Sequence, residues 1–274
     1  MQYNLTLKKM RTEYKTPVQY YLETDSKVIC MNDFIGKQWT FHFSNQINCV
    51  HCDRRIAKTF HQGYCFPCFR SLAECDSCLM SPEKCHYHLG TCRDNTWGET
   101  HCFQPHIVYL ANSSGLKIGI TRISHVPYRF IDQGAIQALP IYQVQNRLQS
   151  GLLEVAFKQY INDKTNWQKM LKGQVESVDL PSKRDELLLT FQQAIDSIQL
   201  DQKDQAFEYL SNQAVFQFEY PGKYQLEKIT TLNLDKTPMF TGLLLGIKAQ
   251  YLIFDCGVIN VRKFSGYNVE VEIL

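Results

Sequence analysis

The stretch VYLANSSGLKIGITR, residues 108–122, decides how the middle of this chain folds. Two β-patterned runs flank a polar turn at residues 112–115, and this pattern predicts a β-hairpin. In the second run Lys117 and Gly119 alternate with Ile118, so they point to the opposite face of the strand. A glycine inside a strand lowers stability unless something must approach the backbone closely there. We therefore interpret Gly119 as a place for a phosphate or a ribose.

A dense cluster of cysteines precedes the hairpin. Nine of the eleven cysteines fall between residues 49 and 102. The motifs CVHC (49–52) and CFPC (65–68) are separated by twelve residues. Two such knuckles complete a tetrahedral zinc site. The predicted ligands of the first zinc ion are Cys49, Cys52, Cys65 and Cys68.

The remaining cysteines of this cluster can supply a second zinc ion, so we expect one or two structural zinc ions. The candidate ligands are Cys75 and Cys78 together with either Cys85 and His88 or Cys92 and Cys102. The spacing leaves both sets open, and alternate pairs can also share ions. His86 and His101 are interpreted as packing or hydrogen-bonding residues, and Cys30 and Cys256 as core thiols.

The bulk composition is that of a folded protein in a reducing compartment. The chain has 274 residues, of which 44% are hydrophobic and 20% are charged. No apolar stretch approaches the roughly 20 residues that cross a bilayer, and MQYNLTLKKM lacks the apolar core of a secretion signal. We therefore expect a cytoplasmic protein with no membrane partner. In that compartment cysteines are more often metal ligands than disulfides.

Charge is distributed unevenly along the chain. Residues 107–173 hold eight basic and three acidic side chains, a balance of +5, whereas residues 176–210 have a balance of −5. A phosphate-facing segment beside a solvated acidic helix would show this asymmetry, and so would two ordinary solvated surfaces.

The two ends of the chain resemble each other. At a constant offset of 230 residues seven identities align without a gap, from Tyr21 with Tyr251 to Gly36 with Gly266. We interpret these segments as two copies of one strand unit, which can pair into a single β module, although shared periodicity alone produces some matches.

The residues around the hairpin resemble the GIY-YIG nuclease superfamily. IVY ends on Tyr109, KIG begins with Lys117, Arg129 lies in PYRFIDQGA and Glu154 lies in GLLEVAFKQYI. The resemblance covers about 65 residues. It implies two strands that carry the halves of the motif, an arginine on the first helix and a metal-binding glutamate on a later helix.

This resemblance implies a phosphodiesterase site with four catalytic residues. Glu154 would hold Mg²⁺ or Mn²⁺, Arg129 would neutralise the transition state, and Tyr109 would orient or deprotonate water. Lys117 occupies the position of the second motif tyrosine, a change that puts hydrolysis in doubt. As alternatives, Tyr109 is a core aromatic, Arg129 solvates a helix, and Glu154 with Lys158 forms a surface ion pair.

Several basic and aromatic side chains are candidates for contact with nucleic acid. They are Lys117, Arg122, Arg129, Lys158, Lys164, Asn166 and Trp167. Trp167 is equally explained as a packing residue. Over its full length the chain resembles the uncharacterised bacterial domain-of-unknown-function family 2797, in segments such as GTCRDNTWGETHC, KTNWQKMLKG and GIKAQYLIFDCGVINVRKFSGY.

These observations predict an α+β protein with a GIY-YIG-like α/β domain. The expected parts are an N-terminal β segment (1–48), a zinc module (49–105), the GIY-YIG-like domain (106–175), an acidic helical segment (176–212) and a C-terminal β segment (213–274). The expected partner is DNA or RNA, with metal-dependent cleavage left open. The alternatives are an inactive zinc-stabilised binding or regulatory module and a protein-interaction scaffold. The sequence does not indicate the oligomeric state.

Overall fold

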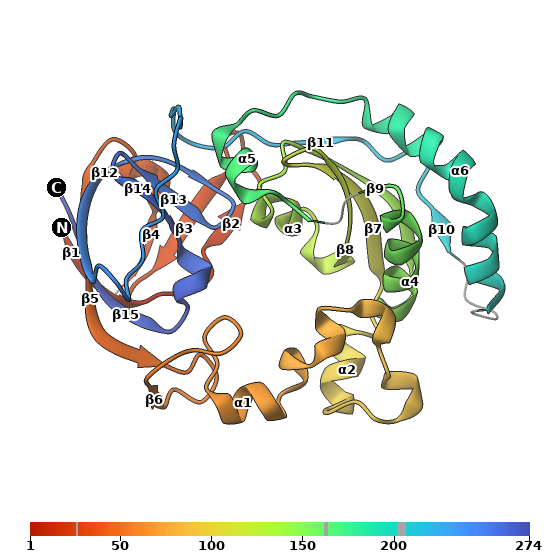
Figure 1. Ribbon diagram of the computed structural model, residues 1–274, viewed down its shortest axis with the longest axis horizontal. Helices are drawn as coiled ribbons and strands as arrows, with labels where there is room; N and C mark the ends of the chain where they lie inside the picture. The colour runs from red at the N-terminus through yellow and green to blue at the C-terminus, as the bar shows by residue number, and fades with distance from the viewer. Residues whose placement is uncertain (26, 162–163, 202–206) are drawn as a thin grey trace. The chain divides into compact units, whose positions relative to one another are not determined.

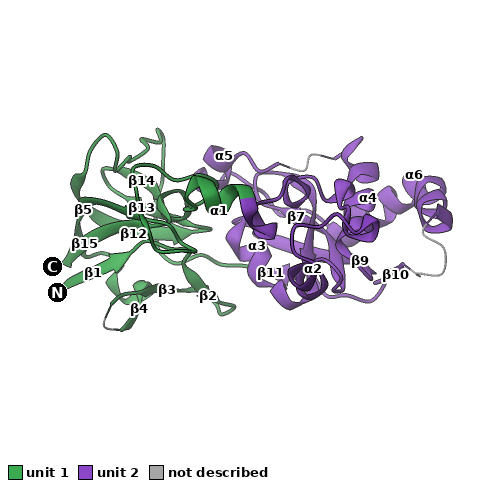
Figure 2. Ribbon diagram, turned by 90° about the horizontal axis from the view of Figure 1, so that it is seen from below, with its two compact units in different colours: residues 1–70, 218–274 green, residues 71–217 purple. Residues whose placement is uncertain are grey.

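The computed structural model describes residues 1–25, 27–161, 164–201 and 207–274. The chain forms two compact units (Figure 2). Unit 1 comprises residues 1–70 and 218–274, and unit 2 comprises residues 71–217. The division between the units falls inside the cysteine-rich segment that the sequence suggested as one zinc module. Part of the expected acidic segment, residues 202–206, lies outside the described residues.

Unit 1 is built on a sheet in which both ends of the chain pair. The strand order is β1-β15-β5-β12-β13-β14, and β6 pairs with the far end of β5. The bounds are β1 Gln2–Thr6, β15 Tyr267–Ile273, β5 Gln38–Asn48, β12 Met239–Lys248, β13 Tyr251–Phe254, β14 Gly257–Asn260 and β6 Arg55–Ile56. The antiparallel pairing of β1 with β15 places the two termini next to each other (Figure 1). A smaller antiparallel sheet contains β2 (Arg11–Glu13), β3 (Gln19–Glu23) and β4 (Val28–Cys30).

The two segments that resemble each other in the sequence form corresponding elements. In the first copy the β3–β4 hairpin pairs Tyr21 with Cys30, and in the second copy β13–β14 pairs Tyr251 with Asn260, at the same offset of 230 residues. Each hairpin leads into a 3₁₀ turn, η1 (Met31–Phe34) or η7 (Val261–Phe264). Each turn is followed by a glycine with positive φ and then by β5 or β15. These last two strands pair with each other, so the two copies meet at β5 and β15, while the β3–β4 hairpin belongs to the smaller sheet.

Aromatic side chains from both copies form the core of unit 1. Trp39 and Phe41 are buried and stack with ring centroids 6.0 Å apart. Phe41 also stacks on Phe240 at 5.1 Å and meets the edge of Phe254 at 6.0 Å. Because β12 pairs with β5 in register, residues from opposite ends of the sequence share this core.

Unit 2 is built on an antiparallel sheet of order β10-β9-β7-β8, with β11 also paired to β9. The bounds are β7 His106–Asn112, β8 Leu116–Arg122, β9 Gln137–Val144, β10 Glu208–Tyr209 and β11 Phe216–Gln217. The hairpin predicted over residues 108–122 is confirmed as β7–β8, with Tyr109 opposite Gly119. All residues of β7 are buried, because both faces of this central strand are covered.

Helices cover one face of this sheet. The buried core there joins Val108 and Leu110 of β7 to Leu153 and Phe157 of α4 and to Phe191 of α6. The helices of unit 2 are α2 Asn95–His101, α3 Tyr128–Asp132, α4 Arg147–Lys158, α5 Trp167–Lys172 and α6 Leu180–Asp201. Asparagine side chains cap α4 and α5, where Asn146 accepts from the N–H of Gln149 and Asn166 from that of Lys169.

The described residues of unit 2 also form five short 3₁₀ turns. They are η2 Ala73–Cys75, η3 Ser77–Leu79, η4 Pro82–Lys84, η5 Tyr87–Leu89 and η6 Ile123–His125. None of the helices in the described part of the chain combines the length and the apolar character needed to span a membrane.

Candidate functional site

The four predicted ligands of the first zinc ion lie together in unit 1. Cys49 directly follows β5, Cys52 precedes β6, and Cys65 and Cys68 lie at the start of α1 (Phe66–Ser71). Their sulfur atoms all lie within 4.8 Å of one another. Cys52 Sγ and Cys65 Sγ are 3.8 Å apart. Two sulfurs bound at 2.3 Å to one tetrahedral zinc are about 3.8 Å apart, so this spacing fits the ion.

The backbone around this four-cysteine cluster favours thiolates. The N–H of Cys65 donates to Cys49 Sγ at 3.2 Å, and the N–H of Cys68 donates to Cys65 Sγ at 3.5 Å. The backbone N–H of Arg54 contributes most to lowering the pKa of Cys52, to about 6. Burial raises the pKa of Cys49, but backbone N–H groups, first that of Cys52, outweigh it and lower this pKa. Burial raises the pKa of Cys68. The donor set therefore fits a structural zinc ion.

The cysteines of unit 2 are arranged differently from the predicted second site. Within the described residues, the second group of at least three close ligand atoms is Asp76, Cys78 and His86. Cys85 and Cys102 form a separate buried pair, in which the hydrogen bond from the Cys102 thiol is the main cause that lowers the pKa of Cys85 to about 6. His88 is exposed. His86 forms a hydrogen bond with Thr91, as its interpretation as a packing or hydrogen-bonding residue expected, and its ring also lies beside a thiol and a carboxylate.

Tyr109 and Lys117 both form hydrogen bonds with the side chain of Gln133. Tyr109 is fully buried, and its hydroxyl donates to Gln133 Oε1 at 2.8 Å. Lys117 Nζ donates to the same oxygen at 2.6 Å and to Thr165 Oγ1 at 2.8 Å. Gln133 directly follows α3 and was not singled out from the sequence. A polar residue at a helix end gives no sequence signal of such a role.

Arg129 and Glu154 approach Tyr109 from two helices. Burial is the main cause that raises the pKa of Tyr109 to about 12. The positive charge of Arg129, on α3, lowers this pKa, and the negative charge of Glu154, on α4, raises it. Both charges therefore lie close to the phenol. The Glu154 carboxylate also pairs with Lys158 at 3.3 Å, as the alternative interpretation expected, and its side chain is 12% exposed.

The ring of Tyr109 fills the space beside Gly119. A Cβ at this position would lie 2.7 Å from Cζ of the Tyr109 ring, so the neighbour that needs a glycine here is the tyrosine across the strand. The interpretation of Gly119 as a place for phosphate or ribose is therefore wrong. Since Tyr109 and Lys117 are both buried, neither side chain is presented to solvent in this arrangement.

The other predicted nucleic-acid contacts lie nearer the surface of unit 2. Arg122 is half-buried, with Nη2 3.0 Å from His125 Nε2. Lys164 is exposed, as is Asn166, whose side-chain oxygen accepts from the N–H of Lys169 at 3.1 Å. Trp167, the first residue of α5, is partly buried.

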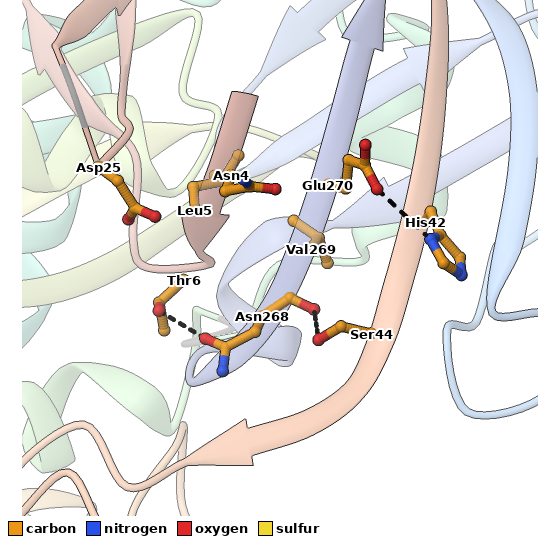
Figure 3. Close-up of a pocket in the computed structure, with 9 residues that line it drawn as sticks. All are labelled: Asn4, Leu5, Thr6, Asp25, His42, Ser44, Asn268, Val269 and Glu270. Carbon is orange, nitrogen blue, oxygen red and sulfur yellow. Dashed lines mark hydrogen bonds and ion pairs between the residues drawn. The ribbon is translucent and has the colours of Figure 1, made fainter. Parts of the chain in front are cut away.

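Unit 1 contains a hollow of about 280 Å³ on the polar face of its sheet (Figure 3). Asn268 lines this hollow. Its side-chain oxygen accepts from Thr6 Oγ1 at 2.6 Å, and its backbone oxygen accepts from Ser44 Oγ at 3.0 Å. Asp25 and Glu270 line the hollow, and the lining includes no lysine or arginine. Carboxylates repel phosphate, so this hollow does not suit a nucleic-acid backbone.

The fold and the four-cysteine cluster define a mixed α/β protein with several sheets and a site that fits a structural metal ion. A family model described as a protein of unknown function (DUF2797) matches residues 36–269, and the chain belongs to this family. No curated protein and no solved structure matches the chain. The resemblance of residues 106–175 to GIY-YIG nucleases stays a prediction.

Proposed function

We propose that unit 2 contains a GIY-YIG-like domain that binds the phosphate backbone of a nucleic acid, and that the four-cysteine cluster holds a structural zinc ion. The order of elements supports this proposal. A hairpin (β7–β8) is followed by a short helix with Arg129, then by β9, which pairs with β7, and then by a helix with Glu154. This is the order that the family layout implies.

The observation that carries the proposal is that the charges of Arg129 and Glu154 both lie close to the Tyr109 phenol. They are separated by a strand in the sequence, and yet the charges of both act on the same phenol. Arg129 and Arg122 are each only partly buried, and in both residues a guanidinium can donate two parallel hydrogen bonds to a phosphate.

Binding is better supported than cleavage. A phenol whose pKa is raised to about 12 stays protonated at neutral pH, so Tyr109 is a poor general base. Lys117 is bonded to Gln133 and Thr165 and does not face solvent. Cleavage remains the second candidate because the Glu154 carboxylate is of the type that binds Mg²⁺ or Mn²⁺.

The test is fluorescence anisotropy of the full chain with labelled single- and double-stranded DNA and RNA between 50 and 200 mM salt. Lys164 and Lys169 are exposed, so the double variant Lys164→Ala/Lys169→Ala removes two charges without disturbing the core. We expect weaker binding and a salt slope reduced by about 0.7 to 0.9 for each lost phosphate contact. Lys8→Ala, an exposed lysine of unit 1, is the matched control and keeps the slope.

The second candidate is tested on the same substrates with Mg²⁺ or Mn²⁺. Nicking that disappears in Glu154→Gln, with affinity retained, would establish cleavage. An affinity that does not depend on salt for any nucleic acid would contradict the binding proposal and leave the protein-interaction scaffold.

A further inference from the structure

Three side chains of unit 2 bring a carboxylate, a thiol and an imidazole to one place. The ligand atoms of Asp76, Cys78 and His86 all lie within 4.8 Å of one another. We propose that Asp76, Cys78 and His86 bind a second zinc ion. This site is independent of the nucleic-acid proposal, and Asp76 does not belong to either ligand set that the spacing suggested.

Short hydrogen-bonded turns hold the three residues in place. Asp76 lies between η2 and η3, where its N–H donates to Ala73 O at 3.0 Å and its carbonyl accepts from the N–H of Leu79 at 3.0 Å. Cys78 lies inside η3 and is buried. Asp76 and Cys78 therefore project from one tight segment, two residues apart, and His86 approaches them after η4.

The contacts of Thr91 are compatible with the metal-binding tautomer of His86. The Thr91 hydroxyl lies 2.8 Å from His86 Nδ1 and donates to the backbone oxygen of His86 at 3.3 Å. A hydroxyl has one proton, so when it donates to the carbonyl it accepts from Nδ1–H. Nε2 then carries the lone pair that a metal needs. A zinc-bound histidine usually donates a hydrogen bond from its other ring nitrogen, and this bond fixes the orientation of the ring.

The distance between Nε2 and the carboxylate fits a shared ion better than a direct bond. His86 Nε2 and Asp76 Oδ2 are 3.6 Å apart, which is too long for a hydrogen bond. In this tautomer both atoms are acceptors, so a metal ion between them would attract both. A nitrogen and an oxygen bound to one tetrahedral zinc are about 3.3 Å apart, so a small adjustment completes the site.

The surroundings orient the carboxylate and keep the site partly open. Arg93 Nε lies 2.8 Å from Asp76 Oδ2, and Ser77 Oγ donates to Oδ1 at 3.2 Å. Ligating carboxylates are commonly held by such outer contacts. The side chains of Asp76 and His86 are 12% and 28% exposed, so water can reach the fourth position. Three protein ligands with a water are typical of an open zinc site, unlike the closed four-cysteine cluster.

The test is the zinc content of the full chain, measured by mass spectrometry after reconstitution with Zn²⁺ and removal of free metal. We expect two ions per chain in the natural protein and one in Cys78→Ser and in His86→Ala. His88→Ala is the matched control, because His88 is exposed and two residues away, and it keeps two ions. One ion in the natural chain, two in His86→Ala, or one in His88→Ala would overturn the proposal.

A second variant tests the proposal if the substitutions of Cys78 and His86 disturb folding. Thr91 is exposed, and Thr91→Val removes the hydroxyl that orients His86. We expect the affinity for one zinc ion, measured in competition with a chelator, to fall about 10- to 100-fold. This is the usual effect of losing a residue that hydrogen-bonds to a metal ligand. Circular dichroism reports the fold in parallel. Unchanged zinc affinity in a folded Thr91→Val protein would contradict the proposed role of His86.

Discussion

At the scale of single residues, Gln133 is the hydrogen-bond partner that Tyr109 and Lys117 share. One side-chain oxygen accepts both the Tyr109 hydroxyl and the Lys117 ammonium group, at 2.8 and 2.6 Å. A buried ammonium group is costly unless polar partners surround it, and Gln133 with Thr165 supplies them. A second tyrosine at this position would have one proton to donate where the lysine has three. Lys117 therefore contributes two hydrogen bonds to the interior of unit 2.

His106 is the residue at which we expect a measurable effect of pH on stability. Burial is the main cause that lowers its pKa to about 4. Nδ1 donates to Gln104 O at 2.6 Å, and Nε2 has no hydrogen-bond partner within the described part of the chain. Between about pH 6.5 and 4 the unfolded chain binds a proton that the folded chain does not, so the free energy of unfolding falls as pH falls. The loss is about 2 kcal/mol at pH 5.

The measurement is urea unfolding of zinc-loaded protein at pH 7 and pH 5. His106→Gln removes the titrating group, so the difference between the two pH values should shrink by about 2 kcal/mol. His125→Gln changes an exposed histidine of the same unit and serves as the control. If His106→Gln retained the full pH dependence, another group would have to be responsible.

At the scale of elements, α4 depends on a glycine that touches another segment. Gly151 faces η4, and a Cβ there would lie 2.4 Å from the backbone nitrogen of Glu83 and 2.6 Å from the carbonyl carbon of Pro82. Backbone atoms cannot turn aside as a side chain does. Gly151→Ala should therefore destabilise the protein by about 1 to 3 kcal/mol, although alanine is the better helix former.

Chemical denaturation compares this variant with Val155→Ala. Val155 is exposed on the same helix, so its truncation should change the free energy of unfolding by less than about 0.5 kcal/mol. A Gly151→Ala protein with a higher free energy of unfolding would contradict this prediction, because it would show that η4 can move away from α4 without loss of stability.

Local patterns in the sequence were enough to predict several elements. The β7–β8 hairpin follows from alternation and turn residues, and the repeated hairpins follow from identities at one offset, since both signals depend on neighbouring residues. The partner of Gly119 and the position of Gln133 depend on packing between segments. Spacing alone likewise could not predict that His86, not His88, lies beside Cys78, because His86 precedes η5 whereas His88 lies inside it, and side chains at these two positions point in different directions.

At the scale of the whole molecule, strands from both ends of the chain pair in the main sheet of unit 1. The four-cysteine cluster lies in the segment that follows β5. β5 pairs with β12 over residues 38–42 and with β15 between residues 39 and 47. Beyond Asn48 the chain forms only the two-residue strand β6 and short turns before α1. A segment with so little regular structure buries little apolar surface, so its folding should depend on the metal.

Removal of zinc from the four-cysteine cluster should therefore unfold residues 49–70 and leave the rest of unit 1 in place. Cys65→Ser removes one ligand of this cluster, and limited trypsin digestion followed by mass spectrometry detects the result. We expect rapid cleavage after Arg54 and Lys58, which precede and follow β6, while β5 and β15 stay protected by their mutual pairing. Cys256→Ser, an exposed cysteine of the same unit outside the cluster, should digest like the natural protein. Equal protection of residues 49–70 in Cys65→Ser would show that this segment folds without its ion, and cleavage throughout unit 1 would show that the ion stabilises the whole sheet.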